Sequence, residues 1–167
     1  MILAVDVGNS NTTVGLFNGT GELLFRALLE TSRSKTRDQC AIELLGVFQL
    51  YGADACTVDG AILSSVVPPL TTIFTDAIAR LTGIPPMVVG PGIRTGLNIK
   101  AEIHNQLGSD IVASSVAAIA KYPSPIVMVD MGTATSLSLI VGSVYEGCII
   151  MPGLALALDA LSERAAA

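Results

Sequence analysis

The sequence predicts an α/β protein built from two duplicated units, each with a mixed sheet that opens with three antiparallel strands, the second unit being incomplete in this chain. The 167 residues are 51% hydrophobic but only 4% aromatic, and such an aliphatic core is typical of buried α/β strands. Short apolar runs alternate with segments of helical spacing, which also indicates this class. The third indication is a motif that occurs twice, as VDVGNSNT from Val5 to Thr12 and as VDMGTATS from Val129 to Ser136.

The first unit begins with three strands joined by turns. Ile2–Val5 is an apolar run that ends in a polar turn over Asp6–Thr12, and Thr13–Phe17 is expected to return as its hairpin partner. Asn18–Glu22 reads NGTGE, which is typical of a tight turn, and a third strand is expected over Leu23–Leu29. Three antiparallel strands at this point argue against a plain Rossmann order.

A helix is predicted next, over Thr36–Tyr51, followed by Gly52. Its spacing suggests an apolar side formed by Ile42, Leu45 and Phe48.

A strand, a helix and a short strand complete the first unit. Gly60–Pro69 reads as a strand that runs into a double-proline turn, and Leu70–Leu81 reads as a helix capped by Gly83. Met87–Gly90 is expected to be a short strand, and Gly90–Lys100 a loop.

The second unit repeats the opening pattern of the first. A helix over Asp110–Tyr122 precedes it, and Pro152 is expected to start another helix with an apolar face. The three strands are predicted over Ile126–Val129, Ser136–Val141 and Val144–Ile150, and the face of the last helix comprises Leu154, Leu158, Leu161 and Ala165. That helix reaches Ala167 without a stop signal, so we expect two lobes, 1–122 and 123–167, with the second cut off partway.

The charge and the cysteine content argue against several classes of function. The net charge is −5 without any basic run, which argues against nucleic-acid binding. The N-terminus does not resemble a signal peptide, and no apolar stretch reaches the ~20 residues of a membrane span. An odd set of cysteines, Cys40, Cys56 and Cys148, lacks metal-ligand spacing and reads as reduced, buried thiols. We therefore expect a cytoplasmic protein.

The low content of charged residues also indicates a surface that is not fully exposed to solvent. Because only 14% of residues are charged, part of the protein surface is expected to contact another subunit or a further part of the chain.

The repeated motif combines the residue types that phosphate binding needs. A strand ends in Asp, a Gly lets the backbone turn, and hydroxyl or amide side chains follow. Exposed N–H groups and hydroxyls cradle phosphate oxygens, and the Asp holds Mg²⁺, usually through water, which bridges the phosphates. Two such turns, 124 residues apart, would grip a nucleotide tail from both sides. The alternative is two ordinary hairpins.

This layout resembles the actin, hexokinase and Hsp70 superfamily, with its two actin/ribonuclease H-like lobes. The segments DVGNSNTTVG, SSVVPP, GPGIRTGLNIK, GSD and DMGTATS, then PG and SERAAA, resemble those of type III pantothenate kinases in order and spacing, over essentially the whole chain. The resemblance implies ATP-dependent phosphorylation of pantothenate to 4'-phosphopantothenate, the first step of coenzyme A biosynthesis. It also implies Mg²⁺, a monovalent cation (K⁺ or NH₄⁺) and a homodimer.

The resemblance assigns roles residue by residue. Asp6 and Asp130 are the expected metal ligands. The expected ATP and phosphate contacts are Asp6, Val7, Gly8, Asn9, Ser10, Asn11 and Thr12 in the first turn and Gly132, Thr133, Ala134 and Thr135 in the second. The family's Gly-Ala-Asp-Arg motif matches Gly108, Ser109, Asp110 and Ile111, which are expected to bind substrate, with Asp110 as the catalytic carboxylate. The alternative for Asp110 alone is a helix N-cap.

Two departures from the family pattern affect the substrate side. Ile111 stands where the family has arginine, and Ala101 where it has an aromatic residue, so weaker or altered pantothenate use is expected. Arg94 and Lys100 are either solvated loop charges or contacts to an anion, and His104, the only histidine, reads as a loop residue. The alternative function is therefore a non-catalytic or altered-substrate paralogue that binds nucleotide and regulates a partner.

Overall fold

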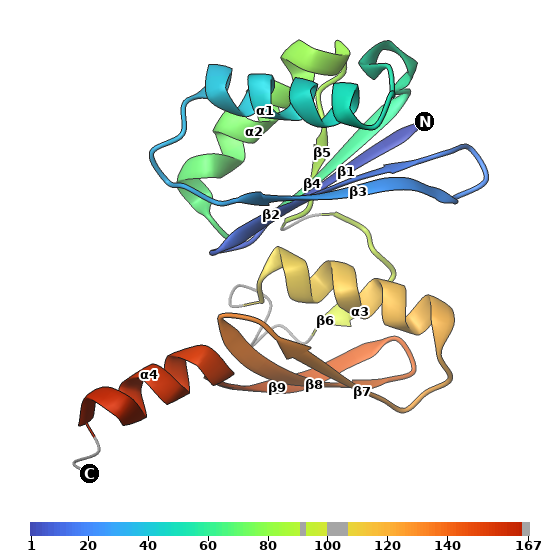
Figure 1. Ribbon diagram of the computed structural model, residues 1–167. Helices are drawn as coiled ribbons and strands as arrows, with labels where there is room; N and C mark the ends of the chain where they lie inside the picture. The colour runs from blue at the N-terminus through green and yellow to red at the C-terminus, as the bar shows by residue number, and fades with distance from the viewer. Residues whose placement is uncertain (91–92, 100–106, 165–167) are drawn as a thin grey trace. The chain divides into compact units, whose positions relative to one another are not determined.

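The computed structural model describes residues 1–90, 93–99 and 107–164, which form two compact units (Figure 1). Unit 1 comprises Met1–Gly90 and Gly108–Asp110, and unit 2 comprises the described residues of 91–107 and 111–167. The predicted lobes, 1–122 and 123–167, are defined by duplication rather than by contacts, and their boundary stays a prediction.

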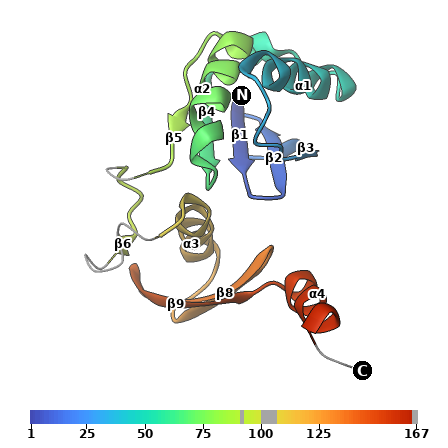
Figure 2. The same ribbon diagram turned by 90° about the vertical axis from the view of Figure 1, so that its left-hand side faces the viewer.

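Unit 1 is a five-stranded mixed sheet with its helices on one face (Figure 2). The strand order is β3-β2-β1-β4-β5, with β1, β2 and β3 antiparallel and β4 and β5 added in parallel. Its elements are β1 (Ile2–Val7), β2 (Asn11–Phe17), β3 (Leu23–Glu30), α1 (Arg37–Leu50), a 3₁₀ turn (Ala55–Thr57), β4 (Gly60–Ser65), α2 (Pro68–Thr82) and β5 (Met87–Val88). The predicted mixed sheet with three antiparallel N-terminal strands is confirmed.

Strand β1 extends past its predicted end. Leu3, Val5 and Val7 are buried, while Asp6 lies on the opposite face, where it pairs in register with Thr13 and Ser64. A polar residue in a strand costs little when its face is not buried, so the predicted turn over Asp6–Thr12 was too long. The turn is limited to the three residues between β1 and β2.

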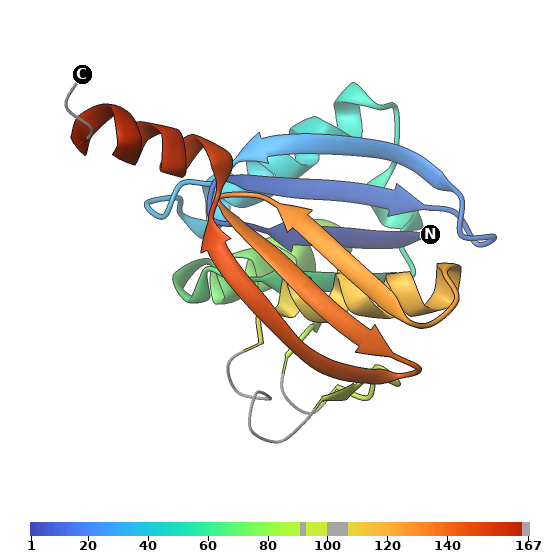
Figure 3. The same cartoon turned by 90° about the horizontal axis from the view of Figure 1, so that it is seen from below.

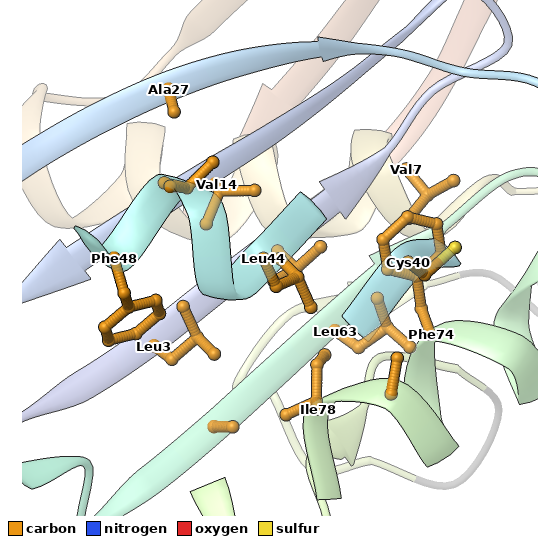
Figure 4. Close-up of a cluster of buried hydrophobic side chains, with 14 of the residues drawn as sticks. Leu3, Val7, Val14, Ala27, Cys40, Leu44, Phe48, Leu63, Phe74 and Ile78 are labelled. Carbon is orange, nitrogen blue, oxygen red and sulfur yellow. The ribbon is translucent and has the colours of Figure 1, made fainter. Parts of the chain in front are cut away.

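Helix α1 buries a different side from the one predicted. Its buried residues are Cys40, Leu44, Val47 and Phe48. Phe48 was predicted correctly, but Ile42 is 69% exposed and Leu45 42% exposed. Apolar residues occur on more than one side of this helix, so periodicity alone did not select the side that packs on the sheet. Figure 4 shows the cluster of buried side chains, which includes Leu44 of α1, Phe74 of α2 and Leu3 of the sheet.

Helix α2 begins earlier than predicted. Strand β4 ends at Ser65 rather than Pro69, and the helix starts at Pro68, with proline in its first turn as proline's fixed φ favours. The predicted cap is confirmed, because Gly83 is left-handed with φ 75° and donates its N–H to the Ala79 carbonyl.

Two glycines of unit 1 make a matched stability test. A Cβ added to Gly46 in α1 or to Gly83 would meet no atom within 4 Å, but only Gly83 has positive φ. We expect Gly46→Ala to raise the free energy of unfolding by about 1 kcal/mol, because alanine favours a helix interior. We expect Gly83→Ala to lower it by about 1–2 kcal/mol, since a side chain strains the left-handed backbone. Chemical denaturation measures both, and shifts of the same sign would contradict the reasoning.

Unit 2 is a four-stranded sheet of order β6-β9-β8-β7 with α3 on one face; Figure 3 shows the opposite face. Its elements are β6 (Asn98–Ile99), α3 (Ser109–Lys121), β7 (Ile126–Met131), β8 (Ala134–Val141), β9 (Val144–Pro152) and α4 (Leu154–Arg164). The small core contains Ala118 of α3 and Ile126, Ile140 and Tyr145 of the sheet. The Tyr145 hydroxyl, which is buried, lies 2.9 Å from Ser138 Oγ.

Three predictions for this unit need correction. The predicted loop over Gly90–Lys100 contains the short strand β6. Strand β9 runs to Pro152 because Pro152 still pairs with Ala134, so α4 begins at Leu154 instead. The described residues of α4 bury none of the predicted apolar face, and Ala165 lies outside the described residues.

The thiols are distributed differently from the prediction. Cys40 is buried, as expected, but Cys56 and Cys148 are exposed. Burial, and then the Glu43 carboxylate, raise the pKa of the Cys40 thiol against a smaller opposing effect of Lys35. Its thiol therefore stays protonated at neutral pH and packs as a small apolar side chain. Over the described part of the chain, no helix has the length and apolar character that crossing a membrane requires.

Candidate functional site

The first repeated turn joins β1 to β2 and is closed by a short backbone hydrogen bond. Gly8 N donates to Asn11 O at 2.9 Å, and Ser10 O accepts from Thr31 N at 3.0 Å. A Cβ on Gly8 would lie 2.9 Å from Asn11 O, so the turn requires glycine there. Asn9, Ser10 and Asn11 are exposed, which leaves their side chains at the surface of the turn.

The second repeated turn joins β7 to β8 in unit 2. Gly132 N donates to Ala134 O at 3.0 Å, which closes the turn as Gly8 does in the first. A Cβ on Gly132 would lie 3.6 Å from Ala134 O, an ordinary contact. The turn itself therefore has room for a small side chain at Gly132, which matters for a ligand that approaches its backbone.

Gly153 is hydrogen-bonded to the second turn, and the sequence analysis did not identify it as a candidate site residue. It is buried between β9 and α4, and its N–H donates to Thr133 O at 3.0 Å. A Cβ at this position would collide with the carbonyl oxygens of Gly132 and Thr133. The signal was the PG dipeptide after β9, but its partner lies twenty residues earlier in the chain, beyond what local pattern reveals.

The two turns share their chemistry and differ in length. An exposed Asp is the penultimate residue of β1 (Asp6) and of β7 (Asp130), and a Gly follows each of these strands directly. Three residues separate β1 from β2, and two separate β7 from β8. The duplicated strand–Asp–x–Gly–strand unit predicted from the sequence is therefore present in both sheets.

Two of the predicted ATP-contact residues lie in the strands that flank the first turn and have buried side chains. Val7 belongs to the core of unit 1, and Thr12 is 1% exposed, with its hydroxyl 2.8 Å from the Thr31 hydroxyl. Any phosphate contact from these residues would come from their backbone. The Thr12–Thr31 pair fastens the start of β2 to the chain that follows β3.

Asp110 belongs to unit 1, at the carboxyl end of β4. Helix α3 begins at Ser109, so Asp110 lies in the first turn and not at the cap, against the N-cap alternative. The Ser109 hydroxyl contacts Ser64 and Ser65 of β4, and Ser64 is the register partner of Asp6. Both carboxylates therefore belong to the same end of the neighbouring parallel strands β1 and β4.

Gly108 makes room for the Asp110 carboxylate. A Cβ on Gly108 would collide with Asp110 Oδ1 and lie 3.4 Å from Val66 Cγ1. A side chain at position 108 would therefore displace the Asp110 carboxylate from its present position.

The remaining predicted substrate residues are less completely described. Ile111 is half-buried and packs against the core of unit 2, and Arg94 is exposed. Lys100, Ala101 and His104 lie outside the described residues. Ile111 therefore contributes packing where the family pattern has arginine.

The described residues contain no group of three or more His, Cys, Asp or Glu side chains suited to a metal ion. Mg²⁺ does not need such a cage, because it commonly keeps several waters and is held by one or two carboxylates and the substrate's phosphates. An exposed carboxylate beside a phosphate turn, as at Asp6 and Asp130, fits this kind of binding.

Comparisons with known proteins agree on one family. A family model described as type III pantothenate kinase matches residues 2–167. Relatives of that name from Listeria monocytogenes and Geobacillus sp. are 40% and 41% identical to the chain over 167 residues. Each alignment covers 99% of this chain and 64% of the relative, so the chain spans about 64% of the length of the curated relatives it matches.

Solved structures of low sequence identity share the fold. The ethanolamine utilization protein EutJ from Carboxydothermus hydrogenoformans has a TM-score of 0.52 at 14% identity, covering 96% of this chain and 56% of its own. The Aquifex aeolicus Ppx/GppA phosphatase has a TM-score of 0.53 at 15% identity, covering 96% and 55%. These neighbours have actin-like folds, which confirms the predicted fold class.

Proposed function

The chain belongs to the type III pantothenate kinase family, and from this premise we propose that the full-length protein phosphorylates pantothenate with ATP, the first step of coenzyme A biosynthesis. The observation that carries the proposal is that Asp110 follows Ser109, which is hydrogen-bonded to the carboxyl end of β4, next to the end of β1 that carries Asp6. A kinase needs a phosphate and metal site beside a carboxylate that receives the hydroxyl proton. In this proposal, unit 1 would supply both.

The proposed reaction transfers the γ-phosphoryl group of ATP to the pantothenate hydroxyl. The bond between the γ-phosphorus and the β–γ bridging oxygen breaks, a bond to the pantothenate oxygen forms, and the hydroxyl proton passes to Asp110. Gly8 to Asn11 and Gly132 to Thr135 would bind the phosphates through backbone N–H groups and hydroxyls. Asp6 and Asp130 would hold Mg²⁺, which neutralises charge on the phosphates.

Further features are proposed on the strength of the family alone. They are a requirement for K⁺ or NH₄⁺, a homodimer and a cytoplasmic location. Contacts from Gly108, Ser109 and Ile111 to pantothenate are proposed on the same ground. Ile111 offers no donor to the pantothenate carboxylate, so we propose weaker pantothenate binding than in relatives with arginine at this position.

The proposal predicts pantothenate-dependent ADP release by the full-length protein. We expect turnover to require both ATP and pantothenate and to stop when EDTA removes Mg²⁺, because the phosphates then lose their bridging cation. A coupled ADP assay, with mass spectrometry of the product, measures this. Nucleotide binding without any phosphorylation of pantothenate would contradict the kinase function and favour a regulatory paralogue.

A further inference from the structure

The Ser109 hydroxyl is tied to the end of β4 by three hydrogen bonds. It accepts one from Ser64 Oγ at 3.1 Å and one from Ser65 N at 3.0 Å, and it donates to Ser65 O at 3.0 Å. A serine hydroxyl has one donor and two acceptor lone pairs. These three bonds therefore use its whole hydrogen-bonding capacity, and none is left for a substrate.

The Ser109 hydroxyl makes the hydrogen bonds that a neighbouring strand would otherwise make to the backbone of β4. Strand β5 pairs with β4 at Ile62 and Leu63, and Val89 N donates to Leu63 O at 2.7 Å on the same side. Ser65 lies two residues beyond Leu63, so its N–H and carbonyl face that side as well. Ser109 satisfies both groups where β5 has already ended.

The strand end that receives Ser109 is itself held in place. Ser65 Oγ accepts from Val67 N at 3.2 Å and from Thr71 Oγ1 at 3.0 Å. These contacts join β4 to the start of α2, whose N-cap residue, Val67, has no side-chain cap of its own. Ser109 is thus attached to a strand end that is itself hydrogen-bonded to the start of α2.

Asp110 follows Ser109 directly in the first turn of α3. Its carboxylate lies close to Gly108, at a position that a Cβ on Gly108 would overlap. On this basis we propose that Ser109 is a positioning residue, which fixes the Asp110 carboxylate at the carboxyl end of β4, the strand that pairs with the Asp6 strand β1. Ser109 stands where the family motif has alanine, so the proposed tie is a feature of this chain, and Ser109→Ala restores the family residue. The inference rests on the proposed kinase function and replaces the expected contact of the Ser109 side chain with substrate.

Steady-state kinetics on the full-length protein test this role. We expect Ser109→Ala to lower kcat about tenfold, which corresponds to about 1.4 kcal/mol in the barrier, with the KM values for ATP and pantothenate nearly unchanged. Ser109→Thr keeps the hydroxyl and should restore kcat to within about twofold. Ser114→Ala removes a hydroxyl from an exposed position of the same helix and should leave kcat unchanged.

A double-mutant cycle separates positioning from a general effect on folding. If Ser109 acts through Asp110, Ser109→Ala should add little to the loss of kcat caused by Asp110→Asn, because the effects of substitutions at coupled residues are not additive. Should Ser109→Ala fail to fold, Ser64→Ala removes one of the three bonds and should lower kcat in the same manner by a smaller factor.

Each other outcome has a definite meaning. Wild-type kcat in Ser109→Ala, or an equal loss in the presence and absence of Asp110, would overturn the positioning role while leaving the kinase function intact. A rise in the KM for pantothenate alone would show that Ser109 contacts substrate after all. An inactive wild-type protein would refute the kinase function itself, and with it the role of Ser109 in that reaction.

Discussion

Asp110→Asn in the full-length protein is expected to lower kcat by about 10²–10⁴-fold, the usual contribution of a positioned general base. Asparagine keeps the size of the side chain over Gly108 but cannot take the proton from the pantothenate hydroxyl. Because the turns proposed to bind phosphate are untouched, the affinity for Mg²⁺ and ATP should change little. Single-turnover phosphorylation and calorimetric nucleotide binding measure the two quantities separately.

The matched control for this variant is Asp76→Asn. Asp76 is also an aspartate of unit 1, exposed on α2, and its loss of charge should leave kcat unchanged. Near-normal turnover in Asp110→Asn would rule out the catalytic role. A large loss of nucleotide affinity would instead place Asp110 on the metal or phosphate side of the site.

Gly153→Ala is expected to lower kcat/KM for ATP by about 100-fold, because a displacement of about 1 Å in a binding group can cost this much. The added Cβ would collide with the carbonyl oxygens of Gly132 and Thr133, so the second turn must move. The overlap involves backbone, which cannot rotate away as a flexible side chain can. Kinetics with varied ATP and a direct binding titration measure the effect.

Two alanine variants serve as comparisons for Gly153→Ala. Gly46→Ala adds the same methyl group in open space in unit 1 and should leave ATP kinetics unchanged. Gly132→Ala leaves the turn intact, since its Cβ would make only an ordinary contact, and so reports on the close approach of phosphate to the backbone. If a folded Gly153→Ala protein binds ATP as the wild type does, the second turn does not contribute to nucleotide binding.

Much of the fold could be predicted because local pattern and tertiary structure agree. The three opening strands, the proline at the start of α2 and the Gly83 cap depend on short-range properties of the backbone. The failures have physical causes. Asp6 was assigned to a turn because it is polar, although a strand tolerates it on the open face of a sheet. The buried side of α1 was misjudged because Ile42 is as apolar as the residues that pack.

The candidate site could be predicted only in part from the sequence. The Asp–x–Gly turns were visible because each is a contiguous segment, and the duplication made them recognisable. The contact of Ser109 with Ser64 joins residues 45 apart, and the contact of Gly153 with Thr133 joins two different turns. No local pattern encodes such pairs, since any serine or glycine at those positions reads as a solvent-facing residue or a turn.

The placement of the thiols has a practical consequence for measuring motion between the units. Within this chain, Cys56 is an exposed thiol of unit 1 and Cys148 an exposed thiol of unit 2, while Cys40 is buried. The native residues thus offer attachment points for a fluorescent donor and acceptor. A hydrogen bond with Asp54 raises the pKa of the Cys56 thiol, so less of it is thiolate at neutral pH and it reacts more slowly with maleimides than an ordinary exposed thiol. Energy transfer between the two dyes would then report whether nucleotide draws the units together.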